Sequence, residues 1–226
     1  MDDEGVLTLD RLVLRQLAVG PMDNDAYLLT CRATGAQLLV DAAAEADRLL
    51  ALVRDGSPDG RLDVVVTTHA HHDHLGALAE VVRETGALAA AGADDAAAVT
   101  AATGVEVGRF LRHGDTVRVG EVELAVVGLR GHTPGSVALA YTEPATALAP
   151  SAVPGRAHLF TGDSLFPGGV GNTQRDPERF AQLYGDVVAR VFDVYRDDTV
   201  VLPGHGRPTT LGAERPHLEE WRERGW

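Results

Sequence analysis

Residues 68–74 have the sequence Thr68-His69-Ala70-His71-His72-Asp73-His74, and they follow directly on the apolar run Leu62-Asp63-Val64-Val65-Val66-Thr67. A nearly continuous run of β-branched residues is typical of a strand that is covered on both faces. Imidazole and carboxylate groups are side chains that zinc, iron and manganese accept as ligands. The sequence therefore predicts a metal site at the point where a buried strand ends.

Three later segments each supply one further candidate ligand: Gly131-His132-Thr133-Pro134-Gly135, Thr161-Gly162-Asp163-Ser164 and Pro203-Gly204-His205-Gly206. In each segment the candidate ligand directly follows a glycine, which permits a sharp turn and a close approach of the backbone. His69 and His71 are two residues apart, so both can point to the same side at the end of a strand. Together these segments predict a two-metal hydrolytic centre.

Strands and helices are expected to alternate along the chain. Strands are predicted over residues 7–13, 27–31, 37–40, 62–67, 117–119, 122–127, 137–141, 158–161 and 200–202, and helices over residues 45–54, after residue 74, over 177–194 and around 217–224. Asp73 is expected near the N-cap of the helix after residue 74. Strands inside and helices outside predict an α/β fold, a four-layer αββα sandwich, built as one domain over residues 1–226. The Ala- and Pro-rich residues 143–157 are expected to be an exposed connection, either plain surface or a mobile lid.

The chain is acidic, with a formal net charge of −13 and a pI near 5.0. This charge argues against nucleic acid or an anionic membrane as a main partner and favours a soluble protein. An anionic small-molecule substrate would have to be attracted locally, most plausibly by metal ions. No apolar stretch is long enough for a transmembrane helix, and the N-terminus Met1-Asp2-Asp3-Glu4 is unlike a secretory signal. The single cysteine, Cys31, permits no intrachain disulfide and is expected in the core. These features predict a cytoplasmic protein and leave its oligomeric state open.

The other histidines and several turn residues have ordinary explanations. Four histidines are expected to be surface or satisfied core residues, with the first of them pointing away from the ligands: His72, His113, His158 and His217. Asp23 and Asn24 fit common turn chemistry. Asp41 ends a predicted strand, where it fits equally well a turn residue and a residue that orients a metal-bound imidazole.

Four phrases carry a family resemblance: His-x-His-x-Asp-His at residues 69–74, Gly-His-Thr-Pro-Gly-Ser at 131–136, Thr-Gly-Asp-Ser-Leu-Phe at 161–166 and Pro-Gly-His-Gly at 203–206. In order and spacing the chain resembles the metallo-β-lactamase-fold hydrolases over nearly its whole length. Within that superfamily it looks most similar to glyoxalase II (hydroxyacylglutathione hydrolase) and its shorter bacterial relatives. The β-lactamases themselves are less similar, because they have Cys at the position of Asp163 or lack a bridging carboxylate.

The resemblance implies two metal ions, with three ligands for each ion and one carboxylate that bridges them. His69, His71 and His132 would hold the first ion, and Asp73, His74 and His205 would hold the second. Asp163 would be the bridge. The ions are expected to be zinc, and the same ligands also suit iron or manganese. A hydroxide shared by both ions would be the nucleophile, and Asp73 would orient it.

The resemblance further implies hydrolysis of a small thioester of a low-molecular-weight thiol. A thiolate is a stable leaving group, so the reaction needs no strong general acid, and the sequence shows none. Classical glyoxalase II has an added C-terminal helical domain whose basic residues hold glutathione. This chain ends at Trp226, soon after His205, and it contains no lysine. The chemistry is therefore expected to carry over, and the thiol is left open.

Other activities of the same fold stay open as alternatives: a persulfide dioxygenase with a single iron, a lactonase or a phosphodiesterase. The complete ligand set disfavours a metal-binding module without catalysis. Two glycine-containing loops, residues 166–173 and 209–212, are expected either to border the substrate pocket or to use glycine only for turns.

Overall fold

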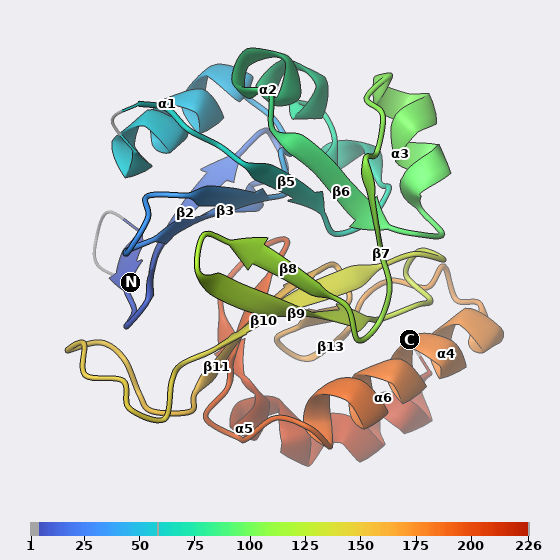
Figure 1. Cartoon of the computed structure of the whole chain (residues 1–226). Coiled ribbons are helices and arrows are strands. Elements are labelled where there is room, and N and C mark those ends of the chain that lie inside the picture. Colours follow the sequence, from blue (N-terminus) through green and yellow to red (C-terminus); the bar gives the residue numbers. More distant parts are fainter. Residues whose placement is uncertain (1–4, 58, 226) are drawn as a thin grey trace.

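Two β-sheets pack face to face in the computed structural model, which describes residues 5–57 and 59–225, and helices cover the outer face of each sheet (Figure 1). The layers follow in the order helix, sheet, sheet, helix, which confirms the predicted four-layer sandwich. Residues 1–4, whose acidity predicted that a secretory signal is absent, lie outside the described residues. Among the helices of the described part, none has the length and apolar character needed to cross a lipid bilayer.

The first sheet has the strand order β1-β2-β3-β4-β5-β6-β7. Its strands are β1 (Val6–Thr8), β2 (Leu12–Val19), β3 (Asn24–Cys31), β4 (Gln37–Val40), β5 (Val64–Thr67), β6 (Leu88–Gly92) and β7 (Arg109–Leu111). Its outer face carries α1 (Ala46–Gly56), α2 (Leu78–Thr85) and α3 (Ala96–Thr103). Pairing is antiparallel from β1 to β4 and parallel from β4 to β7.

Two expectations for this half of the chain were wrong. Residues 7–13 do not form one strand, because the chain turns after β1, where the Leu9 N–H donates to the Leu12 carbonyl at 2.9 Å. Asp73 does not cap α2, because a 3-10 turn over His72–His74 comes first and the helix begins at Leu78. The succession β6-α3-β7 was not predicted at all.

The second sheet has the strand order β15-β14-β11-β10-β9-β8. Its strands are β8 (Thr116–Val119), β9 (Val122–Gly128), β10 (Val137–Thr142), β11 (Ala157–Gly162), β14 (Val200–Pro203) and β15 (Thr209–Thr210), while β12 (Leu165–Phe166) and β13 (Gly169–Val170) form a small separate hairpin. The outer helices are α4 (Pro177–Val187), continued by a π-helical turn over Val188–Phe192, α5 (Leu211–Glu214) and α6 (Leu218–Arg224). The predicted β8–β9 hairpin and both predicted C-terminal helices are therefore present.

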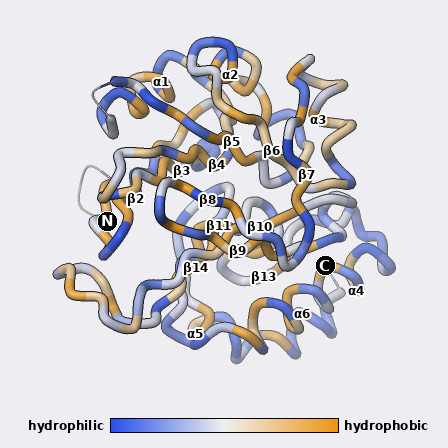
Figure 2. The backbone as a smooth tube through the Cα atoms, in the orientation of Figure 1, coloured by the Kyte–Doolittle hydropathy of each residue, from blue (hydrophilic) through white to orange (hydrophobic). Residues whose placement is uncertain are grey.

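The main core lies between the sheets, where inward-facing residues of both sheets are fully buried, for example Leu14, Leu29, Val66, Val126 and Phe160. Figure 2 shows hydrophobic residues along the strands and hydrophilic ones on the outward faces of the helices. Burying one such side chain stabilises the fold by about 1.5–3 kcal/mol, so the sandwich is a rigid support for the loops at its edge.

Residues 143–156 form a largely exposed connection between β10 and β11, while Ala157 is the buried first residue of β11. They leave the C-terminal end of β10, whose first residue, Val137, donates its N–H to the Thr68 carbonyl at 2.9 Å. The six residues of β10 place this connection roughly 16 Å from Thr68. Asp10 fixes it by accepting the Leu148 N–H at 2.8 Å. The position of this segment favours a plain surface connection over a lid.

Candidate metal centre

Seven side chains from four separate loops converge at one edge of the sandwich, as the sequence predicted. Four of them follow β5: His69, His71, Asp73 and His74. His132 lies in the β9–β10 connection, Asp163 follows β11 and His205 follows β14. β11 and β14 are parallel neighbours, and the Gly204 N–H donates to the Gly162 carbonyl at 2.9 Å. The register of these two strands therefore brings Asp163 and His205 together.

The candidate ligand atoms form three overlapping groups, and within each group they lie within 4.8 Å of one another. The groups are His69, His71 and His132; His69, His74 and Asp163; and Asp73, His74 and His205. These imidazole and carboxylate clusters are consistent with a dinuclear metal site.

Asp163 lies between the two sides of the cluster. Its Oδ1 is 3.4 Å from His74 Nε2, and its Oδ2 is 3.8 Å from His132 Nε2 and 3.6 Å from His205 Nε2. Within the described part of the chain, four buried atoms here have no hydrogen-bond partner: the Nε2 atoms of His69, His74 and His132, and Asp163 Oδ1. Unpaired buried polar atoms destabilise a protein, so a set of them aimed at one point fits a bound cation.

Asp41, at the end of β4, holds one side of the cluster in place. Its carboxylate accepts the Thr68 N–H and the Thr68 hydroxyl, both at 2.7 Å, and it contacts His74 Nδ1 at 2.9 Å. The Thr68 oxygen is in turn 3.0 Å from His69 Nδ1. Both imidazoles are thereby anchored through Nδ1, which leaves Nε2 facing the cluster. Of the two interpretations of Asp41, the structure supports the orienting one.

The backbone anchors two further imidazoles in the same way. His132 Nδ1 donates to the Asn172 carbonyl at 2.8 Å, and His205 Nδ1 donates to the Met22 carbonyl at 3.1 Å. A ring nitrogen that donates to a carbonyl fixes the tautomer and leaves the other nitrogen as a lone-pair donor. Asn172 belongs to the predicted loop 166–173, which therefore does border the site. Residues 209–212 instead form β15 and the start of α5.

Asn24 corrects an expectation, because it is more than a turn residue. Its side-chain amide donates to Asp73 Oδ2 at 3.0 Å and lies 3.3 Å from His205 Nε2. An isolated β-bridge between Asn24 and His205 sets this position. Asp23, the preceding residue, has a φ of 51° in the turn before β3, which agrees with the prediction of turn chemistry.

Asp95 was not foreseen and joins two of the ligand loops. Its side chain is buried, and its Oδ2 accepts the Ala70 N–H at 3.0 Å and the Thr133 hydroxyl at 2.6 Å, while its Oδ1 accepts the Gly135 N–H at 2.7 Å. A Cβ atom at Gly135 would lie 2.3 Å from the Asp95 nitrogen, so only glycine fits there. Asp95 thus ties the loop of His69 and His71 to the loop of His132.

Burial and charge divide the imidazoles into two electrostatic types. Burial lowers the pKa of His69 well below its usual range, and neighbouring imidazoles lower it further. Burial also lowers the pKa of His132, although Asp163 opposes the shift. For His74, burial is outweighed by Asp41 and Asp163, which raise its pKa to about 10. A neutral imidazole is the form that binds metal, and the proton held by His74 between two carboxylates marks a position that favours positive charge.

Asp73 keeps its negative charge despite partial burial. Burial raises its pKa, but the hydrogen bond from Asn24 and the nearby imidazoles of His74 and His205 lower it overall. The four remaining histidines lie outside the three ligand groups. His72 points to solvent, with 90 % of its side chain exposed. His113 and His217 are exposed as well, and His158 is buried in the core away from the cluster.

A cavity of about 420 Å³ opens beside the cluster, and we call it the centre cavity. His71 and His132 line it together with Pro134 and two residues of α4, Arg179 and Gln182. Arg179 Nε donates to the Gly131 carbonyl at 2.8 Å, and its guanidinium also bonds the His132 carbonyl. α4 thereby fixes the backbone that presents His132.

Comparison with known proteins agrees with this fold. Residues 19–149 match the metallo-beta-lactamase superfamily, and the chain belongs to that superfamily. The chain is 30 % identical to an uncharacterized protein of Aquifex aeolicus, with 90 % of this chain and 94 % of that protein covered.

A hydroxyacylglutathione hydrolase of Fuscovulum blasticum is 36 % identical, with 66 % of this chain and 51 % of that enzyme covered. The chain thus spans about half the length of that enzyme. Among solved structures, TTHA1623 in a di-iron-bound form is similar, with a TM-score of 0.65 and 29 % identity over 88 % of this chain and 96 % of that one.

Proposed function

We propose that this metallohydrolase uses two divalent metal ions, most simply zinc, to cleave a small thioester. The observation that carries the proposal is the position of Asp163, whose two oxygens face imidazoles on both sides of the cluster. A carboxylate in this position suits a bridge between two ions. We propose that the domain extends over residues 1–226.

The proposed ligands follow the geometric groups. His69, His71 and His132 would hold one ion, Asp73, His74 and His205 would hold the other, and Asp163 would contact both. The buried Nε2 atoms that lack a hydrogen-bond partner within the described residues support this assignment. Bound divalent ions would supply a water molecule of lowered pKa and would polarise the substrate carbonyl.

The protein's own groups would position the attacking water and accept a hydrogen bond from it. Asp73 stays ionised and is held by Asn24, so it can accept a hydrogen bond from the attacking water and aim it at the carbonyl. We propose Asp73 as the catalytic residue. The centre cavity, lined by His71 and His132, would hold the acyl part of the substrate against the ligands.

A thioester is favoured over other esters for two reasons. Its thiolate leaves without a proton from the enzyme, and beyond the candidate ligands the cavity presents an arginine already bonded to the backbone, Arg179, and an amide, Gln182, rather than a general acid. The similar enzyme of Fuscovulum blasticum bears the name hydroxyacylglutathione hydrolase. The alternatives differ in metal and products.

One experiment separates them. Protein purified without added metal is analysed for bound metal and assayed on S-lactoylglutathione, a lactone, a phosphodiester and a glutathione persulfide. We expect two equivalents of metal and selective thioester hydrolysis. A single equivalent of iron with sulfite formed from the persulfide would overturn the proposal in favour of a dioxygenase. A preference for the lactone or phosphodiester would overturn the thioester assignment alone.

A further inference from the structure

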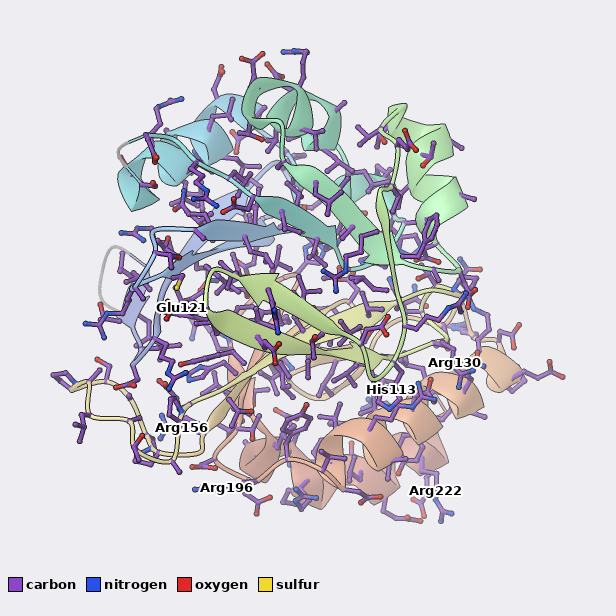
Figure 3. All side chains as sticks on the ribbon, in the orientation of Figure 1. His113, Glu121, Arg130, Arg156, Arg196 and Arg222 are labelled. Carbon is purple, nitrogen blue, oxygen red and sulfur yellow. The ribbon has the colours of Figure 1, made fainter. Side chains whose placement is uncertain are left out.

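A second cavity, of about 260 Å³, lies beside the centre cavity and is lined by basic residues. We call it the arginine cavity after Arg112, Arg130 and Arg190; His113 also lines it. Arg112 and His113 follow β7, Arg130 follows β9, and Arg190 lies in the π-helical turn after α4. Figure 3 shows His113 and Arg130 on the same side of the molecule, close to α4.

The two cavities meet at the loop that carries His132. Pro134 lines both of them, and Arg130 is two residues before His132 in the same connection between β9 and β10. A ligand that reaches from the centre cavity past Pro134 would therefore enter the arginine cavity. Such a ligand would have one part at the candidate metal ligands and another among guanidinium groups.

Two of the guanidinium groups are held in fixed positions by Asp186 of α4. Asp186 is buried, and its carboxylate accepts Arg130 Nε at 3.0 Å and Nη2 at 3.1 Å, while Arg190 Nη2 lies 3.2 Å away. Arg190 also donates to the Gly128 carbonyl at 2.7 Å. Each guanidinium has five N–H donors, so both keep donors that these contacts do not use.

Basic side chains predominate among the charged groups that line this cavity, although the chain as a whole is acidic. The protein carries −13 overall, yet three arginines gather here with two carboxylates, Asp94 in the lining and Asp186 on α4. A third carboxylate, Asp115, accepts the backbone N–H of Arg112 at 2.8 Å. The guanidinium of Arg112 is exposed and makes no hydrogen bond or ion pair within the described residues. Arginine forks match the two oxygens of a carboxylate or the oxygens of a phosphate.

We propose that the arginine cavity binds an oxyanion of the substrate, a carboxylate or a phosphate on the thiol part of the thioester. This inference rests on the proposed thioesterase function and names the substrate class, an anionic thioester. Arg112 supplies the free guanidinium, and the pair held by Asp186 supplies a preorganised second contact. A chain without lysine thus recognises an anionic thiol next to the centre itself.

The test uses Arg112→Gln, with Arg54→Gln as the matched control. Arg54 lies on α1, is also exposed and likewise has no hydrogen bond or ion pair within the described part of the chain. For S-lactoylglutathione we expect kcat/KM to fall about tenfold in Arg112→Gln, mainly through KM. Its diethyl ester, which lacks both carboxylates, should be cleaved equally by the wild type and by both variants.

Calorimetry of product binding gives a readout that needs no turnover. Glutathione and coenzyme A, as carboxylate and phosphate probes, are titrated into wild type, Arg112→Gln and Asp94→Asn. We expect weaker binding of one probe in Arg112→Gln and tighter binding in Asp94→Asn, because a competing carboxylate is removed. Equal binding by all three proteins overturns the inference. Loss of binding in Arg112→Gln without any thioester hydrolysis by the wild type would overturn the proposed function instead.

Discussion

Replacement of Asp95 by asparagine should weaken both the fold and the metal centre. The carboxylate accepts three hydrogen bonds, from the part-buried Ala70 N–H and from the buried Thr133 hydroxyl and Gly135 N–H. An amide of the same shape keeps one acceptor oxygen and turns an NH2 group toward at least one of these donors. A buried donor without a partner destabilises by about 1–3 kcal/mol, and the retained bonds lose their ionic component, so the total loss is about 2–4 kcal/mol.

Urea unfolding measures this loss. With a slope of roughly 2 kcal/mol per molar urea, the midpoint of Asp95→Asn should fall by about 1–2 M. Metal affinity should fall by roughly 10–100-fold, as is typical when a group that orients ligands is lost. Asp94→Asn is the matched control, because the Asp94 side chain accepts no hydrogen bond within the described residues. An unchanged midpoint and unchanged metal affinity in Asp95→Asn would refute the reasoning.

Three further changes test other parts of the structure. Asp163→Ala should bind no more than one equivalent of metal and lose most turnover, and two equivalents at full rate would contradict the bridging role. Asp176→Ala removes the N-cap of α4, which accepts two backbone N–H groups, and should lower the stability by about 1 kcal/mol and the melting temperature by about 2–4 °C in calorimetry. Burial lowers the pKa of His158 to about 4, so at acidic pH the unfolded state binds a proton that the folded state does not bind. Stability should therefore be full above about pH 6.5 and fall by up to about 3 kcal/mol as the pH drops to 4, and His158→Phe should flatten this dependence in urea titrations.

The convergence of the candidate ligands could be predicted because each carries a local signal. Every one is an imidazole or a carboxylate; four lie in the short segment that follows β5, and the other three each directly follow a glycine that permits a sharp turn. The order of the four segments then fixes which edge of the sandwich they share. Cys31 was also placed correctly, since it is buried in the core between the sheets.

The succession β6-α3-β7 could not be predicted, because its residues give no periodic contrast. The helix has the sequence AAAVTAAT, in which nearly every position is small and apolar, and the strand before it, LAAAG, has no β-branched residue. Alanine is compatible with a helix and with a close-packed strand alike, so parallel pairing with β5 decides the outcome. This is a tertiary determinant that no short window of sequence contains.

The roles of Asn24, Asp41 and Asp95 follow the same logic. All three are residue types common in turns, and for Asp41 alone the sequence also offered the orienting role. Each gains its role from a partner far along the chain: His205 for Asn24, His74 for Asp41, and Gly135 for Asp95. The local sequence thus specifies the positions of the candidate ligands, whereas the pairing register of the strands brings the groups that orient them into contact. Variants of these three residues should consequently change metal affinity and stability together, because one hydrogen-bond network supports both.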